Sequence, residues 1–312
     1  MRDSAQINEI LAAIKLARPF YENQWPADFQ CQPEEFGLVS KGGRLAWSQK
    51  PDWLDGDLIK TLLKQGARQL QINIHQCIES TNTHLLAQAQ SQSIANQVHL
   101  AETQSQGRGR RGRSWLSPYA RNLAISLGVD SGRKINDLGG LSLVVGIALA
   151  EALENLGVEG IALKWPNDVW VNEHKLAGIL VELMSSPNGS RIVVGFGVNV
   201  SLNKQEMDAI DQPVTDLRHN GVVETRSIIA SSCINSVSKF LDYFETNGFQ
   251  SFVPAFNKLH ALHEKECVLV NGANVPNKAV KVIGVGPIGQ LIVESKEGVE
   301  QLHGGEISIR PK

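Results

Sequence analysis

The sequence has few cysteines, no long uninterrupted apolar run and no excess of charge of one sign. Its four cysteines are Cys31, Cys77, Cys233 and Cys267. They lie far apart and form no CxxC pair, so they indicate neither a zinc ligand set nor a disulfide framework. The first residues lack the apolar core of a signal peptide, and the longest apolar stretch, 138–156, is interrupted by glycine, serine and glutamate. Neither feature suits secretion or membrane insertion, so we expect a soluble protein in the reducing cytoplasm.

Charge is balanced, with 30 basic against 32 acidic side chains and a net charge of -2. A balanced chain has no general attraction for nucleic acid, so any basic site must be local. The 312 residues are 42% hydrophobic and 20% charged, which suffices for a core and argues against disorder. The length predicts two or three compact units. We place them at residues 1–54, 55–263 and 264–312.

Local patterns predict the elements of each region. In the first, a helical rhythm over 7–17 precedes prolines at positions 19, 26 and 33, which exclude a long helix, and then a hairpin over 36–47 that turns at Gly42-Gly43. The middle region predicts helices over 57–65, 80–89, 137–156 and 227–246, the third with one apolar stripe ended by Gly157. Strands are predicted over 70–75, 98–102, 122–129, 161–165, 169–171, 178–183 and 191–200. The last region has β-rich runs over 268–270, 280–285 and 290–294 between glycine turns, as in a small β-barrel.

The segment Gly107-Arg-Gly-Arg-Arg-Gly-Arg113 has four arginines among three glycines. Guanidinium groups bind phosphate oxygens bidentately, and glycines let the backbone approach a ligand closely, so the segment suits phosphate binding. Its glycines also match the dinucleotide pattern GxGxxG, but that pattern must open a helix, and Ser114-Trp-Leu-Ser-Pro118 interrupts the chain. A solvated basic loop that binds RNA or nothing specific remains an alternative.

Further polar clusters stand at the ends of predicted elements. Lys164-Trp-Pro-Asn-Asp168 follows an apolar run, so the Lys164 ammonium is expected at the rim of a sheet; a simple turn is the alternative. Ser80-Thr81-Asn82 begins a predicted helix and, like Gln104, can bind a polar ring or serve only as a cap. Two glycines in the strand segment Gly195-Phe-Gly-Val-Asn199 predict the close approach of a ligand or another element, or else a bulge.

In this order, the motifs resemble the biotin protein ligase family. The resemblance covers about residues 75–312. Its matching segments are Glu79–Asn82, Gly107–Arg113 with Trp115, Lys164–Asp168, Lys175–Glu182, Gly195–Asn199 and Gly304–Ser308. It implies an α+β fold, with a central mixed sheet flanked by helices of the biotinyl/lipoyl ligase type, and a C-terminal SH3-like barrel. It also implies ATP-dependent activation of biotin to biotinyl-5'-AMP, with Mg²⁺, and transfer of biotin to a lysine of the biotin carboxyl carrier protein of acetyl-CoA carboxylase.

The resemblance also assigns site residues. Lys164 and Arg110 are expected to be catalytic. The expected biotin-binding residues are Ser80, Thr81, Asn82, Gln104, Arg108, Gly109, Arg110 and Lys164. Those expected to bind ATP or the adenylate are Arg108, Arg110, Arg111, Arg113, Trp115, Asn167 and Asn199. The ligands of the metal are not indicated. Some members of the family pair their sheets edge to edge, which makes a homodimer possible.

The first region departs from the winged helix-turn-helix of the family's bifunctional repressors. Residues 36–47 resemble the wing hairpin, but the prolines before it leave little room for a recognition helix. Residues 1–47 carry five basic and six acidic side chains, a poor match to phosphates, so we expect weak or absent DNA binding. Two rival functions remain: a lipoate or octanoate transferase on the same central fold, and a DNA-binding regulator that uses biotin adenylate only as a signal.

Overall fold

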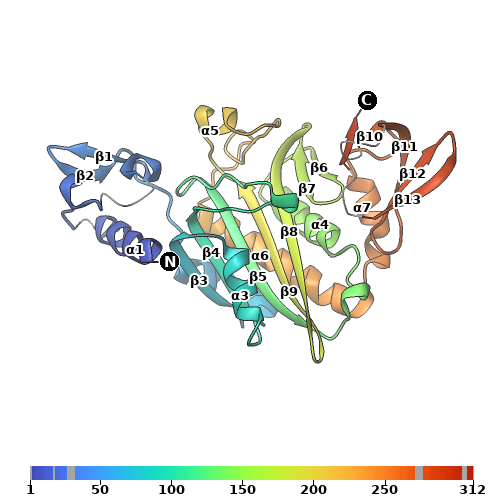
Figure 1. Cartoon of the computed structure of the whole chain (residues 1–312), viewed down its shortest axis with the longest axis horizontal. Helices are drawn as coiled ribbons and strands as arrows, with labels where there is room; N and C mark the ends of the chain where they lie inside the picture. The colour runs from blue at the N-terminus through green and yellow to red at the C-terminus, as the bar shows by residue number, and fades with distance from the viewer. Residues whose placement is uncertain (1, 17, 27–31, 271–276, 304–307, 312) are drawn as a thin grey trace.

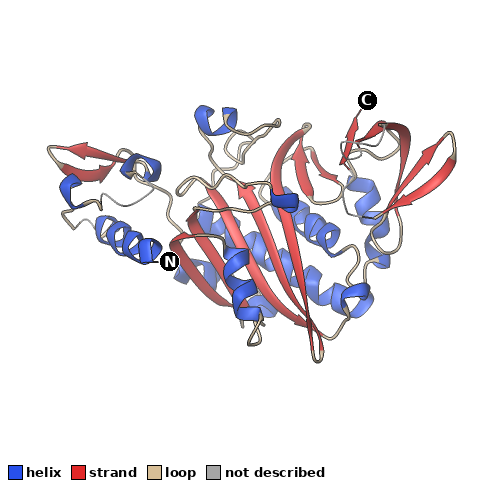
Figure 2. Cartoon of the chain, viewed as in Figure 1, coloured by secondary structure: helices blue, strands red, loops and turns tan. Residues whose placement is uncertain are grey.

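The computed structural model describes residues 2–16, 18–26, 32–270, 277–303 and 308–311. Its centre is a seven-stranded mixed sheet in the order β3-β4-β5-β9-β8-β7-β6 (Figures 1 and 2). Strands β3 and β4 pair in parallel, and all other neighbours in this sheet pair antiparallel. The strands are β3 (Gln71–Ile78), β4 (Gln97–Gln104), β5 (Asn122–Ser131), β6 (Ile161–Lys164), β7 (Asp168–Val171), β8 (His174–Ser186) and β9 (Gly189–Asn199). This mixed sheet confirms the expected fold class.

Helices cover the two faces of the sheet unequally (Figure 1). One face bears α2 (Gly56–Leu62), α4 (Leu141–Glu154) and α6 (Arg226–Asn247), and the other bears α3 (Thr81–Ala89). Helix α4 is buried nearly all round rather than along the one stripe that we predicted, since neighbours such as Leu143 and Val144 are both buried. The sheet covers one side of α4 and α6 covers another, so a helix that is hydrophobic on every side fits there. It ends at Glu154, before Gly157.

The first region packs against the edge of the sheet through α1 (Arg2–Lys15) and continues into the hairpin β1 (Leu38–Lys41) and β2 (Arg44–Trp47). The turn falls at Gly42-Gly43, as predicted. Helix α1 is joined to β3 by Asn8, whose Nδ2 donates to the Cys77 carbonyl (3.2 Å) and whose Oδ1 accepts from the Cys77 N–H (2.6 Å). Between α1 and β1, the described residues form two short 3-10 turns and no second α-helix. Cys31 lies outside the described residues.

Helices α5 (Lys204–Asp208) and α7 (Val253–Leu259) precede the last region in the chain. The last region itself forms a five-stranded antiparallel sheet in the order β13-β12-β11-β10-β14. Its strands are β10 (Glu266–Val270), β11 (Lys278–Val285), β12 (Leu291–Ser295), β13 (Gly298–Leu302) and β14 (Ser308–Pro311). Leu269 and Val282 belong to the same apolar core as α4 and α6. An SH3-like closure of these strands stays a prediction, and positions 304–307 of the last motif lie outside the described residues. In the described ranges, no helix is long and apolar enough to span a membrane.

A buried ion pair holds helix α6 to the sheet. Arg226, at the start of α6, is fully buried and pairs with Glu102 in β4, which is also fully buried. The guanidinium also donates to the carbonyls of Asn122 (2.6 Å) and Asp52 (2.9 Å), and Glu102 accepts from the Leu54 N–H (2.8 Å). This network fixes the segment that leads from the first region into the sheet.

Candidate active site

A cleft of about 1110 Å³ opens on the α3 side of the sheet, over strands β5, β8 and β9. Its walls come from the start of α3, the arginine loop 107–113, the turn between β6 and β7, and the segment 209–214. A single drug-sized ligand occupies a pocket of about 300–1,000 Å³. The cleft therefore has room for two ligands side by side.

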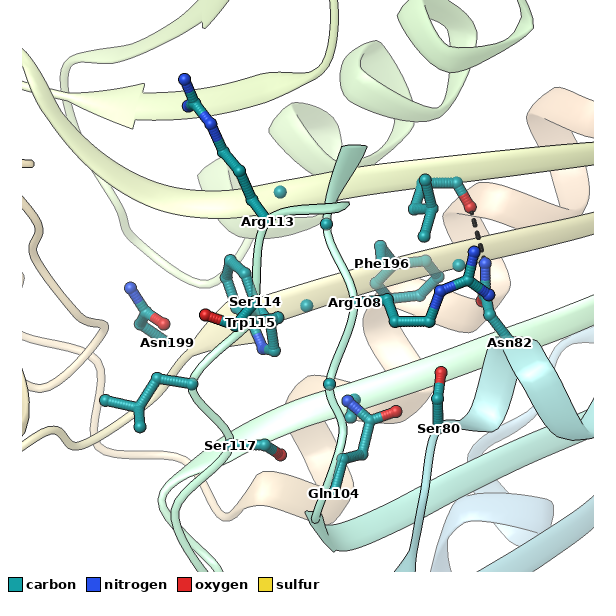
Figure 3. Close-up of a pocket in the computed structure, with 18 of the residues that line it drawn as sticks. Ser80, Asn82, Gln104, Arg108, Arg113, Ser114, Trp115, Ser117, Phe196 and Asn199 are labelled. Atoms are coloured by element: carbon teal, nitrogen blue, oxygen red, sulfur yellow. Dashed lines mark hydrogen bonds between the residues drawn. The ribbon is translucent and has the colours of Figure 1, made fainter. Parts of the chain in front are cut away.

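One end of the cleft is a connected set of uncharged polar groups (Figure 3). Ser80 caps α3, accepting from the Thr83 N–H, so the next two side chains emerge from the first turn. The Thr81 N–H and hydroxyl both contact Gln104 Oε1, at 2.9 and 3.2 Å. In β5, Ser126 Oγ lies 2.7 Å from Thr81 Oγ1 and 2.6 Å from Asn82 Oδ1. Such a network of donors and acceptors suits a polar, uncharged ring.

Asn82 is locked on its other side as well. Its Nδ2 donates to the Leu180 carbonyl (3.0 Å) and to Glu182 Oε2 (2.9 Å), both in β8. A Cβ atom on Gly195 would lie 2.0 Å from Asn82 Oδ1, so only glycine at that position lets the amide reach this depth. The prediction of a close approach at Gly195 is confirmed, and the approaching element is α3.

The arginine loop is a small hairpin held by its own backbone. Arg108 and Ser114 form an antiparallel bridge, and the Gly109 N–H donates to the Arg113 carbonyl (2.8 Å). Residues 110–112 make one 3-10 turn, and extended chain follows. No helix begins there, so the dinucleotide interpretation of the glycines fails, as the sequence indicated.

Arg108 reaches from this loop across the mouth of the polar end (Figure 3). Its guanidinium donates to Thr83 Oγ1 (3.1 Å) and pairs with Glu182 Oε1 (2.8 Å). The Arg108 side chain is still 42% exposed, so the pair is weak by itself.

Trp115 forms the middle of the floor. Its indole lies against β8 and β9, where a Cβ on Gly197 would stand 2.4 Å from Trp115 Cε2. The ring therefore rests on the bare strand backbone, the second close approach that the glycines predicted. Lys175 Nζ lies 5.7 Å from the ring centroid. Among the described residues, Trp115 Nε1 is a buried donor without a hydrogen-bond partner, as expected where a ligand completes the contacts.

The other end of the cleft is cationic. Lys164 ends β6, at the sheet rim as expected, with Nζ 4.3 Å from the centroid of the Trp170 ring. Arg110 Nη1 donates to Asn167 Oδ1 (3.4 Å), and Lys175 pairs with Asp168 (2.9 Å). Burial lowers the pKa of Arg110, the neighbouring Arg111 lowers it further, and Asp168 opposes both. An arginine stays protonated at neutral pH even so, which leaves a concentration of positive charge that favours an anion.

The structure brings all of the expected site residues to the wall of this cleft, although not all of them face its interior. Arg111 and Arg113 are exposed, and Figure 3 shows Arg113 pointing away from Ser80 and Asn82. Asn199 is turned to the backbone, donating to the Thr215 carbonyl (3.1 Å). The sequence did not lead us to predict Ser126. Lys175 and Glu182 belong to a motif that we identified in the sequence, but we predicted no role for either. A polar residue within the apolar run of β5 was the available signal for Ser126.

Comparisons with known proteins agree with this geometry. Residues 74–199 match the model of the biotin/lipoate A/B protein ligase family. The chain is 34% identical over 260 residues to the bifunctional ligase/repressor BirA of Salmonella typhimurium, covering 82% of this chain and 78% of that protein. It is 34% identical over 177 residues to the biotin--[acetyl-CoA-carboxylase] ligase of Mycobacterium tuberculosis, covering 54% and 64%.

Solved structures give the same result. The biotin protein ligase from Aquifex aeolicus, in complex with biotin and ATP, is 26% identical, with a TM-score of 0.66 over 78% of this chain and 99% of that chain. With the 34% identity to a curated relative over most of both chains, these findings confirm the resemblance seen in the motifs: the chain belongs to the biotin protein ligase family.

Proposed function

We propose that this chain activates biotin with ATP to biotinyl-5'-AMP and then transfers the biotin to a lysine of the carrier domain of acetyl-CoA carboxylase. The observation that carries the proposal is the division of one cleft into an uncharged polar end at α3 and a cationic end at the β6–β7 turn. A neutral ring with a carboxylate tail and a triphosphate fit these two ends. The relatives named for biotin ligation support the same reaction.

The first half-reaction joins two anions. The biotin carboxylate attacks the α-phosphorus of ATP, and pyrophosphate leaves. Fixed positive charge between the two groups offsets their repulsion and stabilises the charge that develops on the phosphoryl oxygens. Lys164 and Arg110 line the cationic end and are the groups we assign to this role. Lys175 is already paired with Asp168, so it is better placed to hold that end together than to change partners.

The second half-reaction needs the adenylate to survive until the carrier arrives. The carrier amine attacks the acyl carbon, and AMP leaves. Water competes for the same carbon, so a cover over the intermediate protects it. We assign this cover to the hairpin with Arg108 and Gly109, since its contact with Glu182 spans the cleft mouth and is exposed enough to break.

The remaining assignments follow from position. Ser80, Thr81, Asn82 and Gln104 are proposed to bind the biotin head group, as their shared network suggests. Trp115 and Asn167 are proposed to contact the adenylate. Arg111, Arg113 and Asn199 remain candidates for it, although each must turn toward the ligand to reach it.

Mg²⁺ accompanies ATP in this chemistry, where it neutralises phosphate charge, and it prefers oxygen ligands. In the described part of the cleft wall, Asp168 is paired with Lys175, and Glu182 with Arg108 and Asn82. Both carboxylates are thus engaged, and we assign neither to the metal. Mg²⁺ therefore fits this cleft as an ion that enters already bound to the phosphates of ATP.

A labelling assay tests the proposal. The purified chain is incubated with a biotin carrier domain, ATP, Mg²⁺ and biotin, and the carrier is probed on a streptavidin blot, with each component omitted in turn. Labelling that needs both ATP and biotin is expected. If lipoate displaces biotin in competition, the transferase alternative holds instead. If no label forms while a control ligase labels the same carrier, release of pyrophosphate distinguishes a chain that only makes the adenylate.

Four further proposals come from the sequence. The first region, 1–54, binds DNA weakly or not at all, and a salt-sensitive, sequence-specific gel shift at submicromolar protein would overturn this. The chain works in the cytoplasm, which fractionation of cells tests. A homodimer through a sheet edge is a possible assembly, which sedimentation with and without biotin and ATP tests. Regions 55–263 and 264–312 are proposed as the catalytic unit and the C-terminal barrel.

A further inference from the structure

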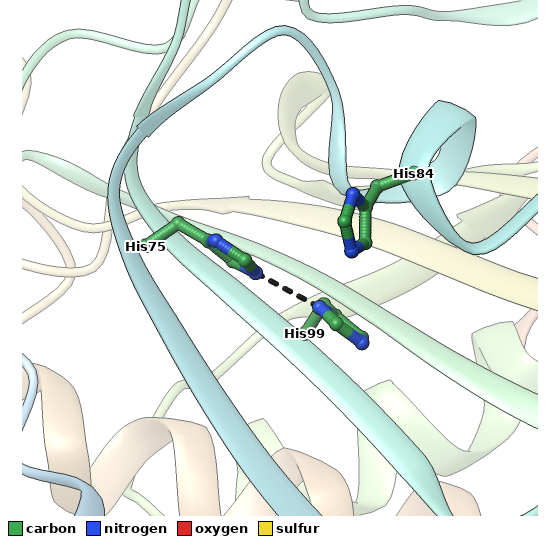
Figure 4. Close-up of side chains that lie close together, drawn as sticks. All are labelled: His75, His84 and His99. Atoms are coloured by element: carbon green, nitrogen blue, oxygen red, sulfur yellow. Dashed lines mark hydrogen bonds between the residues drawn. The ribbon is translucent and has the colours of Figure 1, made fainter. Parts of the chain in front are cut away.

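Three histidines converge between α3 and the strands β3 and β4 (Figure 4), and none of them is among the residues that line the cleft. His75 lies in β3, His99 in the adjacent β4, and His84 on α3 above them. Each offers a ring nitrogen, and these three atoms lie within 4.8 Å of one another. In the part of the chain that the structure describes, this is the one group of three metal-binding side chains so close together. The reaction proposed above uses none of them.

The three rings face one another closely. His75 Nε2 and His99 Nδ1 are 2.8 Å apart, so one of the two donates to the other. The ring centroids of His84 lie 4.7 Å from His99 and 5.4 Å from His75. His99 is buried and the other two are half-buried. The ring nitrogens thus point into a small shared space.

Packing alone does not account for imidazoles here. Burial, and to a lesser extent the charge of the neighbouring histidines, lowers the pKa of His75 to about 4 and that of His99 to about 3. The rings therefore stay neutral at physiological pH, and a neutral imidazole has the lone pair that a metal needs. Apolar rings would fill the same space without the desolvation of three polar groups.

We infer that His75, His84 and His99 bind one divalent transition-metal ion of the Zn²⁺ class, which ties α3 to β3 and β4. Imidazole is a preferred ligand of Zn²⁺, and three protein nitrogens with one open position make a known coordination pattern. Mg²⁺ prefers oxygen and would not compete. The ion would be structural, because it lies outside the cleft, yet it would steady the helix whose first turn carries Thr81 and Asn82.

The geometry requires side-chain shifts of up to about 1.5 Å, because the three ring nitrogens lie within 4.8 Å of one another and one ion needs them about 3.3 Å apart. Two nitrogens that each lie about 2.05 Å from one tetrahedral Zn²⁺ are about 3.3 Å apart, so His75 and His99 must separate by about 0.5 Å. Half-buried His75 has room to turn. His99 Nε2 already contacts Gln97 Oε1 (3.2 Å), the outer contact that orients a histidine ligand.

Gln88, one helical turn after His84, contacts the same ring from the helix side. Its amide lies 2.9 Å from His84 Nε2, with Oε1 buried and without a hydrogen-bond partner. A half-turn of this amide lets Oε1 accept from His84 Nε2–H, which satisfies the buried oxygen. His84 would then keep the lone pair of Nδ1 for an ion, with Gln88 as the outer contact that orients the ring.

Zn²⁺ titration of the full, tag-free chain tests the inference by calorimetry, with Mg²⁺ in excess. We expect one Zn²⁺ per chain and an affinity that falls on the order of 100-fold in His84→Gln and in His75→Gln. The matched control is His174→Gln, which removes an exposed histidine of β8 and should bind as wild type does. The site is overturned if the wild-type chain takes up no Zn²⁺, or if both cluster variants bind it with wild-type affinity.

A second measurement does not depend on the variants folding. Ring nitrogen shifts of the wild-type histidines are recorded by NMR before and after one equivalent of Zn²⁺. We expect the nitrogen signals of three imidazoles to shift. When the chain is loaded with Zn²⁺ beforehand, the added equivalent should no longer shift these three signals. Shifts confined to exposed histidines such as His174 or His263 would place the ion elsewhere and overturn the assignment. Biotin ligation is not needed for either readout, so failure of one proposal leaves the other standing.

Discussion

Gly197→Ala should displace Trp115 and impair activation of biotin while leaving the fold in place. The new Cβ would stand 2.4 Å from Trp115 Cε2, whereas ordinary contacts begin at 3.4 Å. The indole must therefore withdraw by about 1 Å, away from β9 and into the space proposed for the adenylate. Trp115 is half-buried on a loop, so moving the ring is easier than deforming the central strand.

The expected loss follows from that displacement. A shift of about 1 Å in a group that positions a substrate lowers the rate on the order of 100-fold, or about 2.7 kcal/mol in the activation barrier. Pyrophosphate release at varied ATP should show this loss in kcat/KM, with a raised KM for ATP. The unfolding midpoint should remain close to that of wild type, which separates lost function from lost fold.

Gly178→Ala supplies the matched control, because that residue faces the same ring from β8. Its Cβ would lie 3.2 Å from Trp115 Cζ3, which requires a shift of only a few tenths of an ångström. We expect its activity within about threefold of wild type, below 1 kcal/mol. In a Trp115→Ala background, Gly197→Ala should have little further effect, because the clash partner is gone. Equal losses in the two glycine variants, or no loss in Gly197→Ala, would refute the reasoning.

Four other outcomes are expected. Lys164→Ala should slow adenylate formation on the order of 100-fold or more, and near-normal pyrophosphate release would contradict its role. Arg110→Gly should loosen the arginine loop, the proposed cover of the intermediate, and so leak adenylate, which a filter assay for free biotinyl-5'-AMP detects; retention equal to wild type would contradict the covering role of that loop. Arg226→Met should lower the free energy of unfolding in urea by about 3–5 kcal/mol by leaving Glu102 buried and unpaired, and adding Glu102→Gln should recover part of it. In the metal-free chain, the free energy of unfolding should fall as the pH drops from 6.5 toward 4. The reason is that the histidines bind protons in the unfolded chain over this range, whereas in the folded cluster they stay neutral. His75→Gln should make this dependence of stability on pH less steep.

Elements with a local chemical signal were predicted well from the sequence. Ser80 caps α3 through its own side chain, and paired glycines turn the β1–β2 hairpin, so the information lies within a few residues. Strands β13 and β14 had no such signal. Strand β13, Gly-Val-Glu-Gln-Leu, is short and mostly exposed, and it forms because β12 offers it a pairing edge. Strand β14 pairs with β10, which lies much earlier in the chain, and a local sequence pattern does not show so distant a partner.

The same limit applies to the site. The arginines and the lysine motif indicated an anion site, because their chemistry is specific. Ser126, in contrast, was one small residue in an apolar strand. Its importance arises because β5 lies beside β9 and beneath α3, so that its hydroxyl meets Thr81 and Asn82. Glu182 likewise gains its role from β8, which places it between Asn82 and Arg108. Supporting residues of this kind become visible only when the sheet order is known.

Two glycines nevertheless encoded the layout of the cleft. Gly195 and Gly197 are two residues apart in β9, so they face the same side of the sheet and are separated by about 7 Å. One admits Asn82 at the polar end and the other admits Trp115 at the centre of the floor. The spacing along one strand therefore sets how far apart the proposed biotin and adenine contacts stand. The biotin carboxylate and the α-phosphate of ATP must meet between these two contacts. Because both contacts are fixed on one buried strand, the distance available for that meeting is fixed too.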